Sequence, residues 1–179
     1  MIEQEIETIN ETVDFDDPRQ IDYDLLIKGL SNLKEKRVPF NKPVYDKYFK
    51  VRLQNTEQVN PCPLIIVEGA LIFCNKQLRD LFDLSIYIDT DDDVRLSRRV
   101  LKNASKQGKL GYVPLIQLLK TYEEKTKPAF EKFIEPTKKY ANTIIPNYGF
   151  STDVLDPQKM RIQGVDIVVT HVEQQINSH

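Results

Sequence analysis

The chain has 179 residues, with 25 basic and 27 acidic side chains and a net charge of −2. This balance is not typical of a protein that coats nucleic acid or an anionic membrane without specificity, and no apolar run approaches the roughly 18 residues of a membrane span. Two cysteines, Cys62 and Cys74, are too few for a disulfide framework or a cysteine-based metal cluster, and they fit a reducing compartment.

The first 24 residues hold nine acidic side chains and one basic side chain. A secretory signal has a basic start followed by an apolar stretch, and a mitochondrial presequence is basic and poor in acids. Neither pattern is present. We therefore expect an intracellular protein, cytoplasmic by default, although an organelle is left open.

The predicted elements begin with a helix that Asp22 caps and whose leucines recur at helical spacing to about Lys36. Residues 44–49 and 51–59 alternate loosely and predict an exposed antiparallel ribbon, within a hairpin region at 43–61. The wholly apolar run 64–67 predicts a strand that is buried on both faces, as in a parallel sheet covered by helices.

The rest of the chain alternates helices and strands. The expected elements are a short helix at 75–82, a buried strand at 84–89, an amphipathic helix at 91–106, a mostly helical stretch at 113–140 interrupted at Pro128 and Pro136, a strand at 143–145, a loop at 147–161 and a helix at 165–176. This alternation predicts an α/β fold with a parallel sheet.

Three short segments could carry chemistry, and each also has a structural explanation. Glu68, at the end of an apolar strand, could hold a water on Mg²⁺, or it could simply end the strand before a turn at Gly69. Arg95 and Arg99 share one helical face and could bind phosphate, or they could pair with Asp91 and Asp92.

The third segment is Phe15-Asp16, where a carboxylate stands beside an aromatic ring. This pair could bind the hydroxyls and the face of a nucleoside. The alternative is an Asp-Pro turn that buries the phenylalanine. His171 and His179 suggest no catalytic triad, and we expect them to be structural.

Together these segments resemble the uridine–cytidine kinases of the phosphoribulokinase/uridine kinase group. The matching motifs, in chain order, are Asp14–Pro18 with N-F-D-H-P, Pro43–Asp46 with P-V-Y-D, Val67–Gly69 with F-E-G, Asp89–Arg99 with D-T-D-x-D-x-R-L-x-R-R, Lys127–Phe130 with K-P-A-F, and Glu135–Ala141 with E-P-T-K-K-Y-A.

The resemblance implies a single domain over residues 1–179 with a P-loop-kinase-like, three-layer αβα fold, a parallel sheet, an antiparallel hairpin and a lid-like region at 99–122. Such kinases transfer a phosphoryl group from ATP to the 5′-hydroxyl of uridine or cytidine, in pyrimidine salvage. By the same resemblance Phe15, Asp16 and Tyr45 match nucleoside-binding positions, Arg99 matches a substrate-binding arginine, and Glu68 matches the carboxylate on the Mg²⁺ side.

The phosphate-binding loop of these kinases, G-x-x-x-x-G-K-[ST], is not found in the sequence, because none of the six glycines is followed five residues later by another. We therefore assign no catalytic residue and expect no cofactor on this chain alone; ATP and Mg²⁺ are expected only if an N-terminal segment is supplied. The family pattern is also altered at Lys47, Lys50, Lys102, Gln107, Lys109, Thr121 and Asn147.

In kinases of this resemblance the loop follows a central strand, which lies between the strand ending at Glu68 and the strand ending at Asp89. Without it, the two strands could pair directly, a partner chain or a second copy could fill the vacant position, or the sequence could be a fragment. We weigh three functions: a non-catalytic structural or binding subunit of an assembly, an active uridine/cytidine kinase whose phosphate loop lies outside this chain, and a nucleoside-binding module without transfer.

Overall fold

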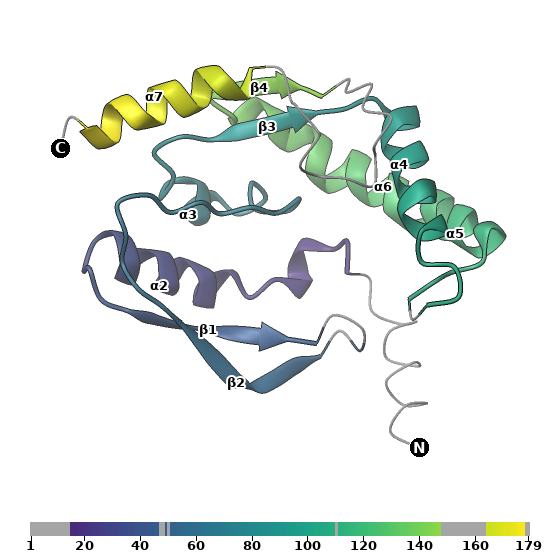
Figure 1. Ribbon diagram of the computed structural model, residues 1–179, viewed down its shortest axis with the longest axis horizontal. Coiled ribbons are helices and arrows are strands. Elements are labelled where there is room, and N and C mark those ends of the chain that lie inside the picture. The colour runs from purple at the N-terminus through teal and green to yellow at the C-terminus, as the bar shows by residue number, and fades with distance from the viewer. Residues whose placement is uncertain (1–14, 47–48, 50, 110, 148–163, 178–179) are drawn as a thin grey trace. The chain divides into compact units, whose positions relative to one another are not determined.

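A computed structural model describes residues 15–46, 49, 51–109, 111–147 and 164–177 (Figure 1). The chain divides into two compact units. Unit 1 comprises residues 1–83 and 124–137, and unit 2 comprises residues 84–123 and 138–179. The expectation of one domain over the whole chain stays a prediction.

Unit 1 contains the predicted first helix and the predicted hairpin. Helix α2, Tyr23–Lys34, begins after Asp22, whose carboxylate accepts a hydrogen bond from the Leu25 backbone N–H at 3.0 Å. Strands β1, Phe40–Tyr45, and β2, Arg52–Val59, pair antiparallel. Both predictions are confirmed, although β1 starts earlier than expected and its register shifts after Pro43.

The core of unit 1 joins the helix to the hairpin and to the segment after residue 70. Leu30 and Leu33 of α2 are buried, as are three apolar side chains further along: Leu71, Phe73 and Leu78. Gly29 lets α2 approach β1 closely, because a Cβ atom at this position would lie 2.6 Å from Cε1 of Phe40. Leu78 belongs to the short helix α3, Lys76–Arg79, which occupies only part of the predicted helix at 75–82.

The prediction of a buried strand at 64–67 is wrong. The segment has no regular secondary structure, and the side chains of Leu64 and Ile66 are 44% and 79% exposed. A strand requires a neighbour to complete its hydrogen bonds, and within the described part of the chain residues 64–67 form no backbone-to-backbone hydrogen bond. The apolar sequence is present, but the partner that would bury it is not among these residues.

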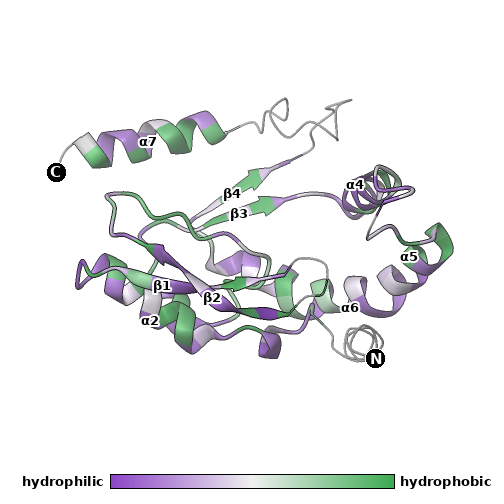
Figure 2. Cartoon of the chain, turned by 60° about the horizontal axis from the view of Figure 1, so that its bottom comes forward, coloured by the Kyte–Doolittle hydropathy of each residue, from purple (hydrophilic) through white to green (hydrophobic). Residues whose placement is uncertain are grey.

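Unit 2 contains the parallel pair that the sequence predicts. Strand β3, Ile86–Asp89, runs parallel to β4, Thr143–Pro146, with Ile88 opposite Ile145. Both strands contain hydrophobic stretches (green in Figure 2), whereas α4, Asp92–Ala104, is largely hydrophilic. The closing helix α7, Val165–Asn177, is confirmed, and the predicted loop at 147–161 lies almost wholly outside the described residues.

One edge of β3 is open in the described structure. The carbonyls of Ser85 and Asp89 accept hydrogen bonds from the backbone of Thr143 and Asn147 on the β4 side, at 3.1 and 2.6 Å. Because backbone groups alternate direction along a strand, those of Ile86 and Ile88 face the opposite edge. The only partner of β3 among the described strands is β4, and the direct pairing of β3 with residues 64–67 stays a prediction.

Residues 115–140 are helical throughout. The expected interruptions at Pro128 and Pro136 are therefore wrong, and the type of helix changes near each proline instead. Helix α5, Leu115–Thr121, continues into a π-helical turn, Tyr122–Thr126. Helix α6, Lys127–Ala129, then continues into a second π-helical turn, Phe130–Ile134. A 3₁₀ helix, Glu135–Tyr140, ends the helical stretch. Each π-helical turn comes just before a proline. Proline lacks an N–H and clashes with the preceding turn, and the helix changes its hydrogen-bond pattern there instead of breaking.

The predicted parallel sheet and antiparallel hairpin are thus present, each in its own unit. Among the residues that the structure describes, no helix has the length and apolar character needed to cross a membrane.

Candidate functional site

The candidate segment Phe15-Asp16 forms a turn before a short 3₁₀ helix, Pro18–Gln20. The neighbouring Asp17 caps this helix by accepting a hydrogen bond from the Arg19 backbone N–H at 2.8 Å, and it also binds the Arg19 guanidinium at 2.6 Å. These hydrogen bonds lower the pKa of Asp17 to about 2. Asp17 therefore has a structural role in this turn. The alternative explanation required Phe15 to be buried, but its side chain is 40% exposed.

Tyr45, the third nucleoside-binding candidate, lies at the end of β1 opposite Arg52 and is 52% exposed. The Arg52 guanidinium approaches the carboxylate of Asp22 at 4.0 Å. Because Asp22 caps the start of α2, this ion pair joins the end of the hairpin that carries Tyr45 to the end of α2 that follows Phe15-Asp16. The structure thus brings Phe15, Asp16 and Tyr45 to one end of unit 1.

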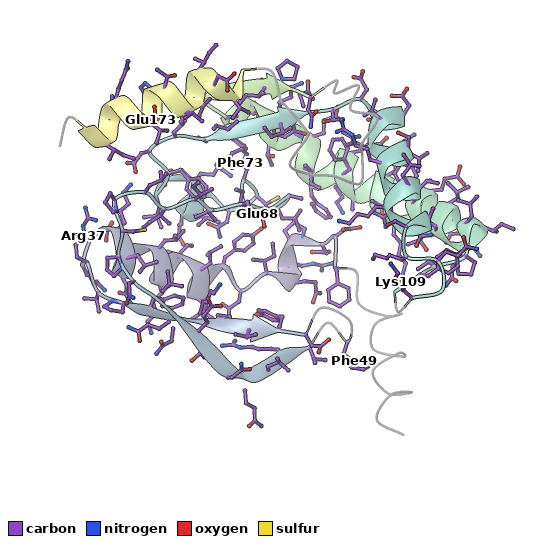
Figure 3. All side chains as sticks on the ribbon, viewed as in Figure 1. Arg37, Phe49, Glu68, Phe73, Lys109 and Glu173 are labelled. Carbon is purple, nitrogen blue, oxygen red and sulfur yellow. The ribbon has the colours of Figure 1, made fainter. Side chains whose placement is uncertain are left out.

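The turn of the hairpin is partly described. The Asp46 N–H donates to the Val51 carbonyl at 2.9 Å, and the Asp46 carboxylate accepts from the Phe49 N–H at 2.9 Å. Phe49 is exposed and lies at the tip (Figure 3). The altered positions Lys47 and Lys50 fall outside the described residues.

Glu68, the candidate on the Mg²⁺ side, is exposed (Figure 3). Gly69 follows it where space is limited, since a Cβ atom there would lie 3.0 Å from Cγ2 of Ile72. Across the described ranges, no three His, Cys, Asp or Glu side chains gather as metal ligands. Glu68 therefore offers one carboxylate, which could hold Mg²⁺ only together with ligands from elsewhere.

Unit 2 gathers polar groups at the carboxyl ends of its two strands, where open α/β sheets bind ligands. The Lys138 ammonium lies 2.5 Å from the Asp89 carboxylate and 5.9 Å from the centre of the Tyr87 ring. Asn147 is buried, and its side-chain oxygen accepts a hydrogen bond from Arg98 at 3.3 Å. The sequence did not indicate either contact, because both join residues 49 apart.

The arginines of α4 divide between the two explanations. Arg95 pairs with Asp92 and donates to the Thr90 carbonyl, as the structural alternative expected. Arg99, the substrate candidate, is exposed on the same helix. The altered positions of the lid-like region, Lys102, Gln107 and Lys109, are exposed as well, and Figure 3 labels Lys109.

The phosphate loop has no substitute among the described elements. A phosphate cradle uses backbone N–H groups at a glycine-rich turn from a strand into a helix. The turn from β3 into α4 is Thr90-Asp91, and it is followed by Asp92 and Asp93 in the first turn of the helix. These carboxylates would repel phosphate, so this turn does not fit a nucleotide triphosphate.

The family is established by comparison with known proteins. The model of the phosphoribulokinase / uridine kinase family matches residues 1–151, and the chain belongs to this family. It is similar to the uridine kinases of Limosilactobacillus reuteri (35% identity, 90% of this chain, 72% of the relative), Latilactobacillus sakei (39%, 84% and 69%) and Borrelia duttonii (41%, 80% and 67%). The resemblance that the motifs indicate is confirmed, whereas truncation and loss of catalysis stay predictions.

Proposed function

We propose that this chain is the nucleoside-binding and lid part of an ATP-dependent uridine/cytidine kinase, acting in the cytoplasm. It phosphorylates the nucleoside 5′-hydroxyl when a strand with a glycine-rich phosphate loop is supplied from outside the 179 residues. The observation that carries this proposal is the placement of Phe15, Asp16 and Tyr45 at one end of unit 1. All relatives named above are uridine kinases, which supports the same substrate class.

The chemistry of this end suits a pyrimidine nucleoside. Phe15 and Tyr45 present aromatic rings that are about half exposed, on which a base can stack. A carboxylate such as that of Asp16 accepts hydrogen bonds from neighbouring sugar hydroxyls. These two kinds of contact recognise the base and the sugar of one ligand.

Phosphoryl transfer depends mostly on positioning and on charge stabilisation around the phosphates. The described residues lack the cradle for this, and Glu68 is the one metal-side carboxylate that the resemblance assigns. ATP and Mg²⁺ therefore require the added segment, whose strand would find an open edge on β3. A second copy or another protein that supplies a strand would satisfy the same edge.

Transfer from ATP to uridine and cytidine tests this proposal, with the chain alone and with the chain joined to the N-terminal strand and loop of a related uridine kinase. We expect no turnover from the chain alone and turnover on the order of 1–100 s⁻¹ from the joined protein. Turnover by the chain alone would contradict the need for the loop.

Calorimetry with uridine tests the nucleoside end separately. Asp16→Asn and Tyr45→Ala should each weaken binding by about tenfold, because each removes a contact on the order of 1 kcal/mol or more. Asp24→Asn is the matched control, since Asp24 is an exposed acid in the first turn of α2. Equal effects from all three variants would refute the assignment.

A second candidate is a non-catalytic binding subunit. It is favoured by Lys102, Gln107 and Lys109, which stand where the family pattern has lid arginines. Lysine offers no bidentate fork for phosphate, and glutamine offers no charge. This candidate is correct if the joined protein binds uridine and still transfers no phosphate.

A further inference from the structure

We propose that Asn103 is a positioning residue that latches the loop between α4 and α5, of which the structure describes residues 105–109 and 111–114. Its side-chain amide donates a hydrogen bond to the Val113 carbonyl at 2.6 Å, and its side-chain oxygen accepts one from the Val113 backbone N–H at 3.0 Å. One side chain thus exchanges two hydrogen bonds with the backbone of a residue ten positions away, as a paired strand residue would.

The latch fixes both ends of the loop. Asn103 belongs to the last turn of α4, and its own carbonyl accepts from the Lys106 N–H at 3.0 Å. Val113 precedes Pro114, whose carbonyl accepts the Leu118 N–H at 2.9 Å at the start of α5. The contact therefore holds the end of one helix against the beginning of the next.

Only a carboxamide suits this contact. The Val113 carbonyl needs a donor and the Val113 N–H needs an acceptor, and the asparagine side chain has one of each at the required spacing. Aspartate would keep the acceptor but would place a second oxygen against the carbonyl. Alanine would leave both backbone groups of a half-buried contact without this partner.

The latched loop carries charge that the proposed reaction would use. Lys106 and Lys109 lie on it, and their positions depend on turns at Gly108 and Gly111, whose φ angles of +73° and +84° favour glycine. Groups that stabilise developing phosphate charge must be held in place before the reaction. This role of the latch rests on the proposed kinase function.

Hydrogen exchange tests the latch itself on the full chain. In Asn103→Ala, exchange of the Val113 amide should rise about tenfold, and trypsin should cleave faster at Lys106 and Lys109. Ser105→Ala is the control, because the Ser105 hydroxyl donates to the Lys102 carbonyl of α4 and not to Val113. Exchange of the Val113 amide within about twofold of the unmodified chain would refute the latch.

Kinetics of the joined kinase test the positioning role. Asn103→Ala should lower kcat about tenfold with little change in KM for uridine, and Asn103→Asp should fall between it and the unmodified enzyme. An unchanged kcat would overturn the positioning role. A loss of kcat accompanied by a comparable loss of hydrogen-exchange protection along the whole of α4 would overturn it as well. If the joined kinase with Asn103 intact is inactive, the proposed function and this role both fail, while the exchange experiment still decides the latch.

Discussion

Gly29 lies where α2 packs against the Phe40 ring of β1, and replacing it with alanine tests that packing directly. Alanine is the better helix former by about 1 kcal/mol, so the change would stabilise an isolated helix. Here the new methyl carbon would lie 2.6, 2.8 and 2.9 Å from three atoms of the Phe40 ring. Overpacking of this kind costs about 1–3 kcal/mol, and we expect a net destabilisation of about 1 kcal/mol.

A double-mutant cycle separates the two effects. In a chain that carries Phe40→Ala the ring is gone, so Gly29→Ala should now stabilise α2 by about 0.5–1 kcal/mol. Native-state hydrogen exchange of the α2 amides is the suitable assay, because it reports on this helix even if the two units unfold separately. If Gly29→Ala stabilises α2 with Phe40 in place, the reasoning is refuted.

Three further predictions concern single side chains. The pKa of Asp17 lies below the usual 3.8 of an aspartate. The contribution of Asp17 to stability, measured by urea unfolding, should therefore be lost as pH falls from about 4 to about 2, and Asp17→Asn should remove that pH dependence. Lys138→Met should lower the protection of β3 amides by about 1 kcal/mol or less, because the pair with Asp89 is partly exposed; a larger loss would contradict this. Cys62 is exposed and should alkylate well before Cys74, since burial raises the pKa of the Cys74 thiol; equal rates by mass spectrometry would contradict it.

The sequence predicts best the elements that depend on local signals. Asp22 caps α2 as expected, and leucines at helical spacing mark its buried face. The apolar pattern also predicts β3 and β4, which complete each other within one unit. The segment 64–67 is more apolar than either strand, but whether it forms a strand depends on a neighbour, and residue patterns within the segment carry no information about that.

The candidate site shows the same division. The motifs identify Phe15, Asp16 and Tyr45, and the structure brings them to one end of unit 1 through the pair of Arg52 and Asp22. Contacts that depend on the fold were missed, among them the pair of Lys138 with Asp89. A possible signal existed for Asn103, because an asparagine in the last turn of a helix often binds nearby backbone, but its partner ten residues away was not evident.

The two π-helical turns, Tyr122–Thr126 and Phe130–Ile134, have an evolutionary consequence. Such a turn holds one residue more than an α-helical turn, so it behaves as a one-residue insertion that the helix has absorbed. Deleting one residue within either turn should restore ordinary α-helical winding and leave the flanking helical segments nearly in place, whereas deleting one residue in the middle of α4 would rotate one side of that helix by about 100° relative to the other. Single-residue length differences among relatives are therefore expected to be tolerated at these two turns more readily than in the middle of α4.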